Sequence, residues 1–221
     1  MARRRSIQVM QRLDWYFDFI SGYAYLQFEM LDRLPAGTTV AFKPILFAGL
    51  LKHHGHKGPG EIPGKRRFTY TQWAWLGQRL GIPLTMPPTH PFNPLNALRL
   101  ALARNCRKDA IQTIFRFIWR EGRGVEDAAG VAELGRRLGL ADPAAAIAAP
   151  AVKAKLRANT EEAVARGLFG VPTFAVDGEQ FWGADSTDML LDYLARPERF
   201  QTGEIARVRA LPLGTMRKEV S

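Results

Sequence analysis

The sequence has a single cysteine, Cys106, in 221 residues, so it excludes an internal disulfide and a Cys-x-x-Cys redox pair. Cys106 lies in a stretch with helical patterning, where a structural thiol is a better interpretation than a nucleophile. No apolar run approaches the roughly 20 residues that a membrane-spanning helix needs. The basic start, Met1 to Ser6, is not followed by an apolar segment of the signal-peptide type. These absences predict a cytoplasmic protein with no membrane partner.

Acidic residues are the scarcer charge. The chain has 31 Lys and Arg against 21 Asp and Glu, which gives a net charge of +10. This balance suits an anionic partner. The basic residues are spread along the chain, however, and no nucleic-acid-binding motif accompanies them. We therefore expect no nucleic-acid binding, and we interpret the charge as solubility plus attraction for an acidic ligand.

The hydrophobic patterning indicates a mixed sheet that is interrupted by helices. Residues 13–19 and 39–44 resemble strands on either side of a helix over 23–33, which is the size of a βαβ unit. Strand character returns at 171–176 and 179–182, with a hairpin turn at Asp177-Gly178 and a last helix over 186–194. The long middle stretch has apolar residues at helical spacing over 65–80, 94–104, 108–121, 125–139, 143–149 and 150–166.

Ser21 stands where the first strand hands over to the first helix. Unpaired backbone N–H groups and the positive end of the helix dipole favour an anion at such a place. The Ser21 hydroxyl could there donate a hydrogen bond to a bound thiolate. Serine is also one of the best N-cap residues, so Ser21 could simply begin the helix. The segment alone leaves both interpretations open.

A second informative segment is Gly170-Val171-Pro172-Thr173-Phe174. A proline at the head of a strand belongs at a strand start or an edge. A cis bond before Pro172 would turn the N–H and C=O of Val171 outward, ready to pair with an extended peptide ligand. The alternative is a trans proline that only starts the strand.

Four pieces in order now resemble a known family. They are Phe17-Asp18-Phe19-x-Ser21-x-Tyr23-x-Tyr25-Leu26, Lys52 in a loop, Gly170 to Phe174, and Phe181-Trp182-Gly183-x-Asp185. Together they are similar to 2-hydroxychromene-2-carboxylate isomerase, a glutathione-dependent relative of kappa-class glutathione transferases and DsbA-type thioredoxin folds. The resemblance implies an α/β thioredoxin-like fold (βαβ…ββα) with a large all-helical insertion. We expect the thioredoxin-like domain over 10–48 and 168–197, the insertion over 49–167 and a peripheral basic tail over 198–221.

The resemblance also implies roles for individual residues. Ser21 would contact the glutathione sulfur, and Val171 with cis-Pro172 would pair with the glutathione backbone. The γ-glutamyl end would be held by Trp182, Gly183, Ala184 and Asp185. His56 stands where the family has an asparagine that meets glutathione, and Lys65 is similar to a basic residue that meets an acidic group. Tyr23, Lys52 and His90 are the expected substrate contacts. Both lysines could instead be ordinary solvated side chains.

Two further positions depart from the family pattern, and one cluster invites a metal interpretation. Gly22 replaces a proline that usually follows the serine, and Ser186 replaces an arginine. The cluster His53-His54-Gly55-His56 has no cysteine or second acidic group nearby at ligand spacing, so we expect a polar loop and no metal. Phe68, Trp73 and Trp75, at helical spacing, are expected in the core.

The function implied is isomerisation of 2-hydroxychromene-2-carboxylate, or a similar aromatic hemiketal, to the ring-opened trans-benzylidenepyruvate. Glutathione is the expected cofactor, and the resemblance implies a homodimer acting in aromatic catabolism. A kappa-like glutathione transferase and a non-catalytic thioredoxin-fold binding protein are the alternatives. A disulfide oxidoreductase is excluded, because Ser21 and Ala24 occupy the two redox positions.

Overall fold

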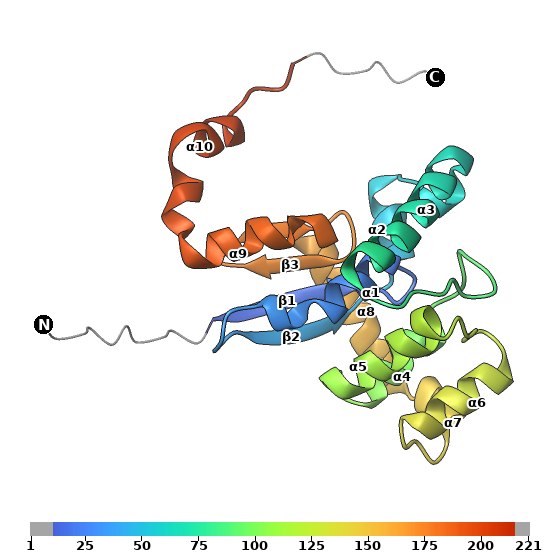
Figure 1. The fold of residues 1–221 in the computed structure, drawn as a ribbon. Coiled ribbons are helices and arrows are strands. Elements are labelled where there is room, and N and C mark those ends of the chain that lie inside the picture. The colour runs from blue at the N-terminus through green and yellow to red at the C-terminus, as the bar shows by residue number, and fades with distance from the viewer. Residues whose placement is uncertain (1–10, 215–221) are drawn as a thin grey trace, which may run out of the picture.

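A four-stranded mixed sheet forms the centre of the computed structural model, which describes residues 11–214 (Figure 1). Its strands are β1 (Arg12–Phe17), β2 (Thr39–Pro44), β3 (Thr173–Val176) and β4 (Glu179–Trp182), in the order β2-β1-β3-β4. β1 is parallel to β2, whereas β3 is antiparallel to both β1 and β4. The βαβ and ββ units predicted from the sequence are therefore confirmed. The basic start and the tail residues 215–221 lie outside the described residues.

Each face of the sheet has its own apolar core, because side chains alternate along β1. Leu13, Trp15 and Phe17 point to the larger core, where α1 (Gly22–Glu29) and α9 (Thr187–Ala195) pack. Tyr16 points to a smaller core on the other face, which α2 (Phe47–His54) and α8 (Pro150–Ala165) cover. The sheet thus lies between two helical layers, and the carboxyl end of β1 opens into the start of α1.

The chain between β2 and β3 is helical, as expected. It contains α3 (Pro63–Leu80), α4 (Leu95–Ala103), α5 (Lys108–Phe115), α6 (Ala128–Arg137) and α7 (Pro143–Ala148), besides α2 and α8. The Asp142 side chain caps α7, and Gly81 ends α3 with a φ of 65°. Three single-turn 3-10 helices also precede α9, over Leu31–Arg33, Pro59–Glu61 and Ala184–Ser186. No helix in the described range 11–214 is long and apolar enough to cross a membrane.

The structure corrects the sequence prediction around the first strand and after the second. β1 ends at Phe17, two residues early, and residues 18–20 form a turn. α2 was not predicted, so Lys52 lies in a helix and not in a loop. This helix is only eight residues long and contains Gly49, which weakens its local signal. Tertiary packing requires that glycine, because a Cβ there would lie 2.8 Å from a methyl carbon of Thr160 on α8.

Two other segments differ from the prediction. The helix expected over 108–121 becomes α5 followed by a single π-helical turn over Arg116–Arg120. The region expected as a peripheral basic tail contains most of a 3-10 helix, Pro197–Gln201, and α10, Gly203–Arg209. Phe200 in this region is buried against Tyr193, and Arg209 pairs with Glu179 on β4 at 2.7 Å.

Candidate functional site

Ser21 is the N-cap of α1, as its sequence position predicted. Its Oγ accepts a hydrogen bond from the Ala24 backbone N–H at 3.2 Å, and its φ and ψ of −92° and 114° are extended. The side chain is nearly buried, with 8% of the residue exposed. As a helix cap, the Ser21 Oγ only accepts a hydrogen bond. Among residues 11–214, no acceptor is recorded for the hydrogen of the Ser21 hydroxyl, so this hydrogen can still be donated. The cap and a donor to a bound sulfur are therefore compatible roles for the same hydroxyl.

The turn that presents Ser21, residues 18–21, is anchored from several distant elements; we call it the serine turn. The Ser21 N–H donates to the Asp18 carbonyl at 3.1 Å, which closes the turn. Trp119, on the π-helical turn, donates its indole N–H to the Phe19 carbonyl at 2.8 Å. His90 Nε2 lies 2.8 Å from the Ile20 carbonyl. Because so many groups hold it, the serine turn is a rigid platform.

Asp18 is a fully buried acid at the base of this turn, and no role was predicted for it. Its Oδ1 accepts from the Ile20 N–H at 3.1 Å and its Oδ2 from the Phe47 N–H, at the start of α2, at 2.9 Å. Burial raises the pKa of Asp18 to about 7, against the opposing effect of these backbone donors. Asp18 thus joins the serine turn to α2. Its place inside the motif was the only signal that the sequence offered.

The Val171–Pro172 peptide bond is cis, as predicted. β3 runs antiparallel to β1 with Thr173 opposite Tyr16, so the chain just before Thr173 lies beside the end of β1 and the serine turn. Within the described part of the chain, the backbone N–H and C=O of Val171 take part in no hydrogen bond. Val171 is 7% exposed, and these unpaired backbone groups lie directly before β3, at the end of the sheet where β1 leads into the serine turn.

The motif after β4 lies at the same end of the sheet. The Gly183 N–H donates to the Pro172 carbonyl at 2.8 Å, which fixes this segment beside the cis proline. Gly183 has a φ of 89°, and a Cβ there would collide with the Asp185 carboxylate. The departure at Ser186 has a local explanation, since its hydroxyl donates to the Gly183 carbonyl at 2.8 Å.

Tyr23 connects the first helix with two other parts of the predicted site. Its hydroxyl donates to the Gln72 side chain on α3 at 2.6 Å. Burial raises the pKa of Tyr23, and the negative charge of Asp185 raises it further. The fold therefore brings Tyr23, Ser21 and Asp185 to one end of the sheet, although 164 positions separate the outer two along the chain.

Gly22 departs from the family pattern because Trp73 occupies the space beside it. A Cβ on Gly22 would lie 2.5 Å from Trp73 Cδ2, so a proline ring would collide there. Trp73 is buried, as predicted, and stacks on Tyr70 with ring centroids 5.4 Å apart. The prediction was wrong for Phe68 and Trp75, which are 66% and 50% exposed on the outer side of α3.

His90 was expected to line the substrate pocket, but its ring is engaged within the protein. A carbonyl can only accept, so Nε2 carries the proton toward Ile20, and Nδ1 accepts from the Tyr70 hydroxyl at 2.6 Å. Burial lowers the pKa of His90 and favours this neutral form.

Three other predicted contacts are exposed side chains on the α2–α3 side of the molecule. Lys52, His56 and Lys65 make no side-chain hydrogen bond or ion pair with residues 11–214, although the His56 ring stacks on His54. No described contact joins them to the serine turn.

Chemistry-bearing side chains elsewhere do not form a second centre. The Cys106 thiol is half-buried, and burial raises its pKa to about 11, which suits a structural role. Among residues 11–214, no three His, Cys, Asp or Glu side chains lie together as metal ligands would.

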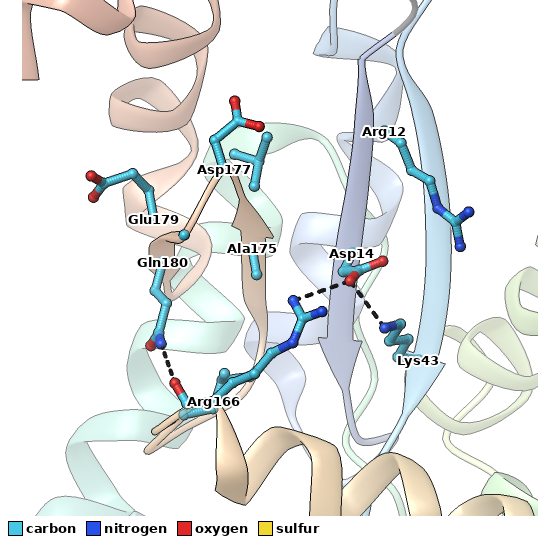
Figure 2. A pocket seen from close by; sticks show the side chains of 11 residues that line it. Arg12, Asp14, Lys43, Arg166, Ala175, Asp177, Glu179 and Gln180 are labelled. Carbon is cyan, nitrogen blue, oxygen red and sulfur yellow. Dashed lines mark hydrogen bonds and ion pairs between the residues drawn. The ribbon is translucent and has the colours of Figure 1, made fainter.

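A hollow of about 700 Å³ lies at the opposite end of the sheet (Figure 2). There Asp14 pairs with Lys43 at 3.0 Å and with Arg166 at 3.2 Å, while Asp177 and Glu179 stand on the far rim. It includes none of the predicted site residues. The candidate site is therefore the end of the sheet that holds the serine turn, not this hollow.

The mixed sheet, the helix that begins at Ser21 and the cis proline beside it define a thioredoxin-like protein with serine in the redox position. The family model of the DSBA-like thioredoxin domain matches residues 12–195, and the chain belongs to this family. The chain is 29% identical over 205 residues to glutathione S-transferase kappa 2 of Caenorhabditis elegans, covering 83% of this chain and 91% of the relative. It is 28% identical over 189 residues to 2-hydroxychromene-2-carboxylate isomerase of Sphingobium xenophagum, covering 82% and 97%. A solved structure of 2-hydroxychromene-2-carboxylate isomerase superimposes with a TM-score of 0.72 over 87% of this chain and all of that chain, at 24% identity.

Proposed function

We propose that this protein is a glutathione-dependent isomerase. Its substrate is 2-hydroxychromene-2-carboxylate or a similar aromatic hemiketal, and its product is the ring-opened trans-benzylidenepyruvate. The observation that carries the proposal is that a helix-capping serine and the unpaired backbone groups of Val171 lie at the same end of the sheet. A peptide thiol needs both: an edge that pairs with its backbone, and a donor at its sulfur.

The residues present fit glutathione. Val171 offers one N–H and one C=O, which complement the backbone of a tripeptide. The Ser21 hydroxyl and the N-terminus of α1 favour a thiolate over a thiol. Asp185 is an exposed carboxylate that complements the ammonium group of the γ-glutamyl end. Lys52 and Lys65 are exposed cations free to meet carboxylates of glutathione or substrate.

Bound glutathione would supply a thiolate that adds to the conjugated double bond of the substrate, which permits rotation about that bond, and then leaves unchanged. Ser21 would hold the sulfur in its anionic form by hydrogen bonding. Tyr23 would orient the substrate beside α1, and the neutral His90 would hold the carbonyl side of the serine turn. No redox step is needed, so the lack of a Cys-x-x-Cys pair agrees with this chemistry.

The test is turnover of 2-hydroxychromene-2-carboxylate, followed by the ultraviolet absorbance of the product, with and without glutathione. We expect glutathione-dependent turnover that Ser21→Ala reduces strongly. Turnover that does not depend on glutathione, or none in its presence, contradicts the proposal. Gel filtration of the purified protein tests the accompanying proposal that it is a homodimer, and cell fractionation tests its cytoplasmic location.

The second candidate is transfer of glutathione to an electrophile by the same site. It is supported by the kappa-class relatives, which match about as well as the isomerases. An aryl halide assay separates the two functions. Conjugate formation without chromene turnover favours the transferase, and chromene turnover favours the isomerase.

A further inference from the structure

The amide of Gln27 is a fully buried polar group that connects three elements around the candidate site. Gln27 is 1% exposed and lies on α1, six residues after Ser21. Its Oε1 accepts from the Trp15 indole N–H at 2.7 Å, and its Nε2 donates to the Gly183 carbonyl and to Thr187 Oγ1, both at 3.1 Å. Both amide hydrogens and the amide oxygen are used, so the orientation of the group is fixed.

The Gly183 carbonyl is the point where α1 meets the segment that carries Asp185. Ser186 also donates to this carbonyl, from its hydroxyl at 2.8 Å and its N–H at 3.3 Å. Because both Ser186 donors belong to the segment that carries Asp185, they set the conformation of that segment but not its position relative to α1. The bond from Gln27 spans 156 residues and does fix that position.

We propose that Gln27 is a positioning residue that sets the spacing between Ser21 and Asp185, so that one tripeptide reaches both. The inference rests on the proposed function, because it presumes glutathione as the ligand. A tripeptide held at its sulfur and at its γ-glutamyl end has a fixed reach, and small misplacements of one anchor weaken both contacts. In this proposal Gln27 touches neither end of the ligand and acts through its bonds to Gly183 and Thr187, at the two ends of the segment that carries Asp185.

The test is the affinity of Gln27→Met for two thiol ligands. Methionine keeps the length of the side chain and removes the amide. We expect the Kd for glutathione to rise about tenfold, roughly the effect of one lost hydrogen bond. The Kd for cysteinylglycine, which lacks the γ-glutamyl group, should stay within about twofold. The pKa of bound glutathione thiol should not change.

Asn159→Leu is the matched control, because it also removes a fully buried amide. Asn159 is 3% exposed on α8 and donates to the Pro44 carbonyl at 3.0 Å, on the other face of the sheet. We expect it to lower stability without selective loss of glutathione affinity. If Gln27→Met does not fold, Gln27→Glu replaces it. In Gln27→Glu, a protonated carboxyl can still donate a hydrogen bond to the Gly183 carbonyl. The glutathione affinity of this variant should therefore fall as the pH is raised and the carboxyl loses its proton.

Non-additivity gives a second measurement. If Gln27 acts through the Asp185 segment, Gln27→Met and Asp185→Asn together should weaken glutathione binding less than the product of their separate effects. Wild-type affinity in Gln27→Met, or an equal loss for glutathione and cysteinylglycine, overturns this inference alone. Absence of glutathione binding by the wild-type protein overturns the proposed function and this inference with it.

Discussion

Replacing Asp18 with asparagine should remove a pH dependence from the free energy of unfolding. Asp18 is fully buried, and its pKa is about 7 in the folded chain against 3.8 for an ordinary aspartate. Between these values the folded protein binds more protons at this site than the unfolded chain does. The stability that this proton provides is therefore complete below about pH 4 and is lost as the pH rises through about 7.

The size of the effect follows from the two pKa values. They differ by about three, and each pKa unit corresponds to about 1.36 kcal/mol, so the loss is about 4 kcal/mol. His90 acts in the opposite direction, because its lowered pKa adds stability as the pH rises. Both proteins contain His90, so the difference between their stability curves isolates Asp18.

Urea unfolding followed by tryptophan fluorescence, from about pH 5 to about pH 8, measures both curves. We expect the wild-type protein to lose stability relative to Asp18→Asn across this range. Parallel curves would refute the reasoning. If Asp18→Asn does not fold, the carboxyl carbon of Asp18 in the wild-type protein can be titrated by NMR, and an apparent pKa near 4 would refute it equally.

Three further outcomes follow from the site. Ser21→Ala should raise the pKa of the bound glutathione thiol by about one to two while changing the affinity for glutathione little. The reason is that hydrogen bonds to charged groups are worth about 1.5–3 kcal/mol. An unchanged thiol pKa in an ultraviolet titration, with turnover intact, would leave Ser21 as a helix cap only. Gly22→Ala should cost about 1–3 kcal/mol of stability, because its Cβ would lie 2.5 Å from Trp73 Cδ2. Adding Trp73→Phe should recover part of that loss in urea unfolding, and strictly additive losses would contradict the contact. Gly183→Ala should weaken glutathione binding, because the φ of 89° at Gly183 and the nearby Asp185 carboxylate leave no place for a Cβ. A wild-type Kd for glutathione in calorimetry would count against the role of this segment.

Features that depend only on neighbouring residues could be predicted from the sequence. Ser21 and Asp142 cap helices because their side chains reach a backbone N–H three residues away. Asp177-Gly178 makes the β3–β4 turn because both residues adopt a positive φ, 51° and 84°. The order of strands and helices follows from hydrophobic periodicity in the same local way.

The polar groups that surround the serine turn could not be predicted from the sequence, because they come from distant parts of the chain. Three hydrogen-bond donors reach the turn from other elements: Phe47, His90 and Trp119. They lie 29, 70 and 100 positions from their acceptors, and no local sequence pattern encodes such pairings. The same holds for His90, whose ring is consumed inside the fold. It holds also for α2, a short helix stabilised by packing on α8.

Burial was the second property that the sequence could not decide. Phe68, Trp73 and Trp75 share one helix and similar side chains, yet only Trp73 is buried. Phe68 and Trp75 are seven positions apart and share the outer face of α3, whereas Trp73 lies on the buried stripe with Thr69 and Gly77. The absence of a Cβ at Gly22 leaves space for the Trp73 indole over the start of α1. That space exists only once α1 and α3 have come together.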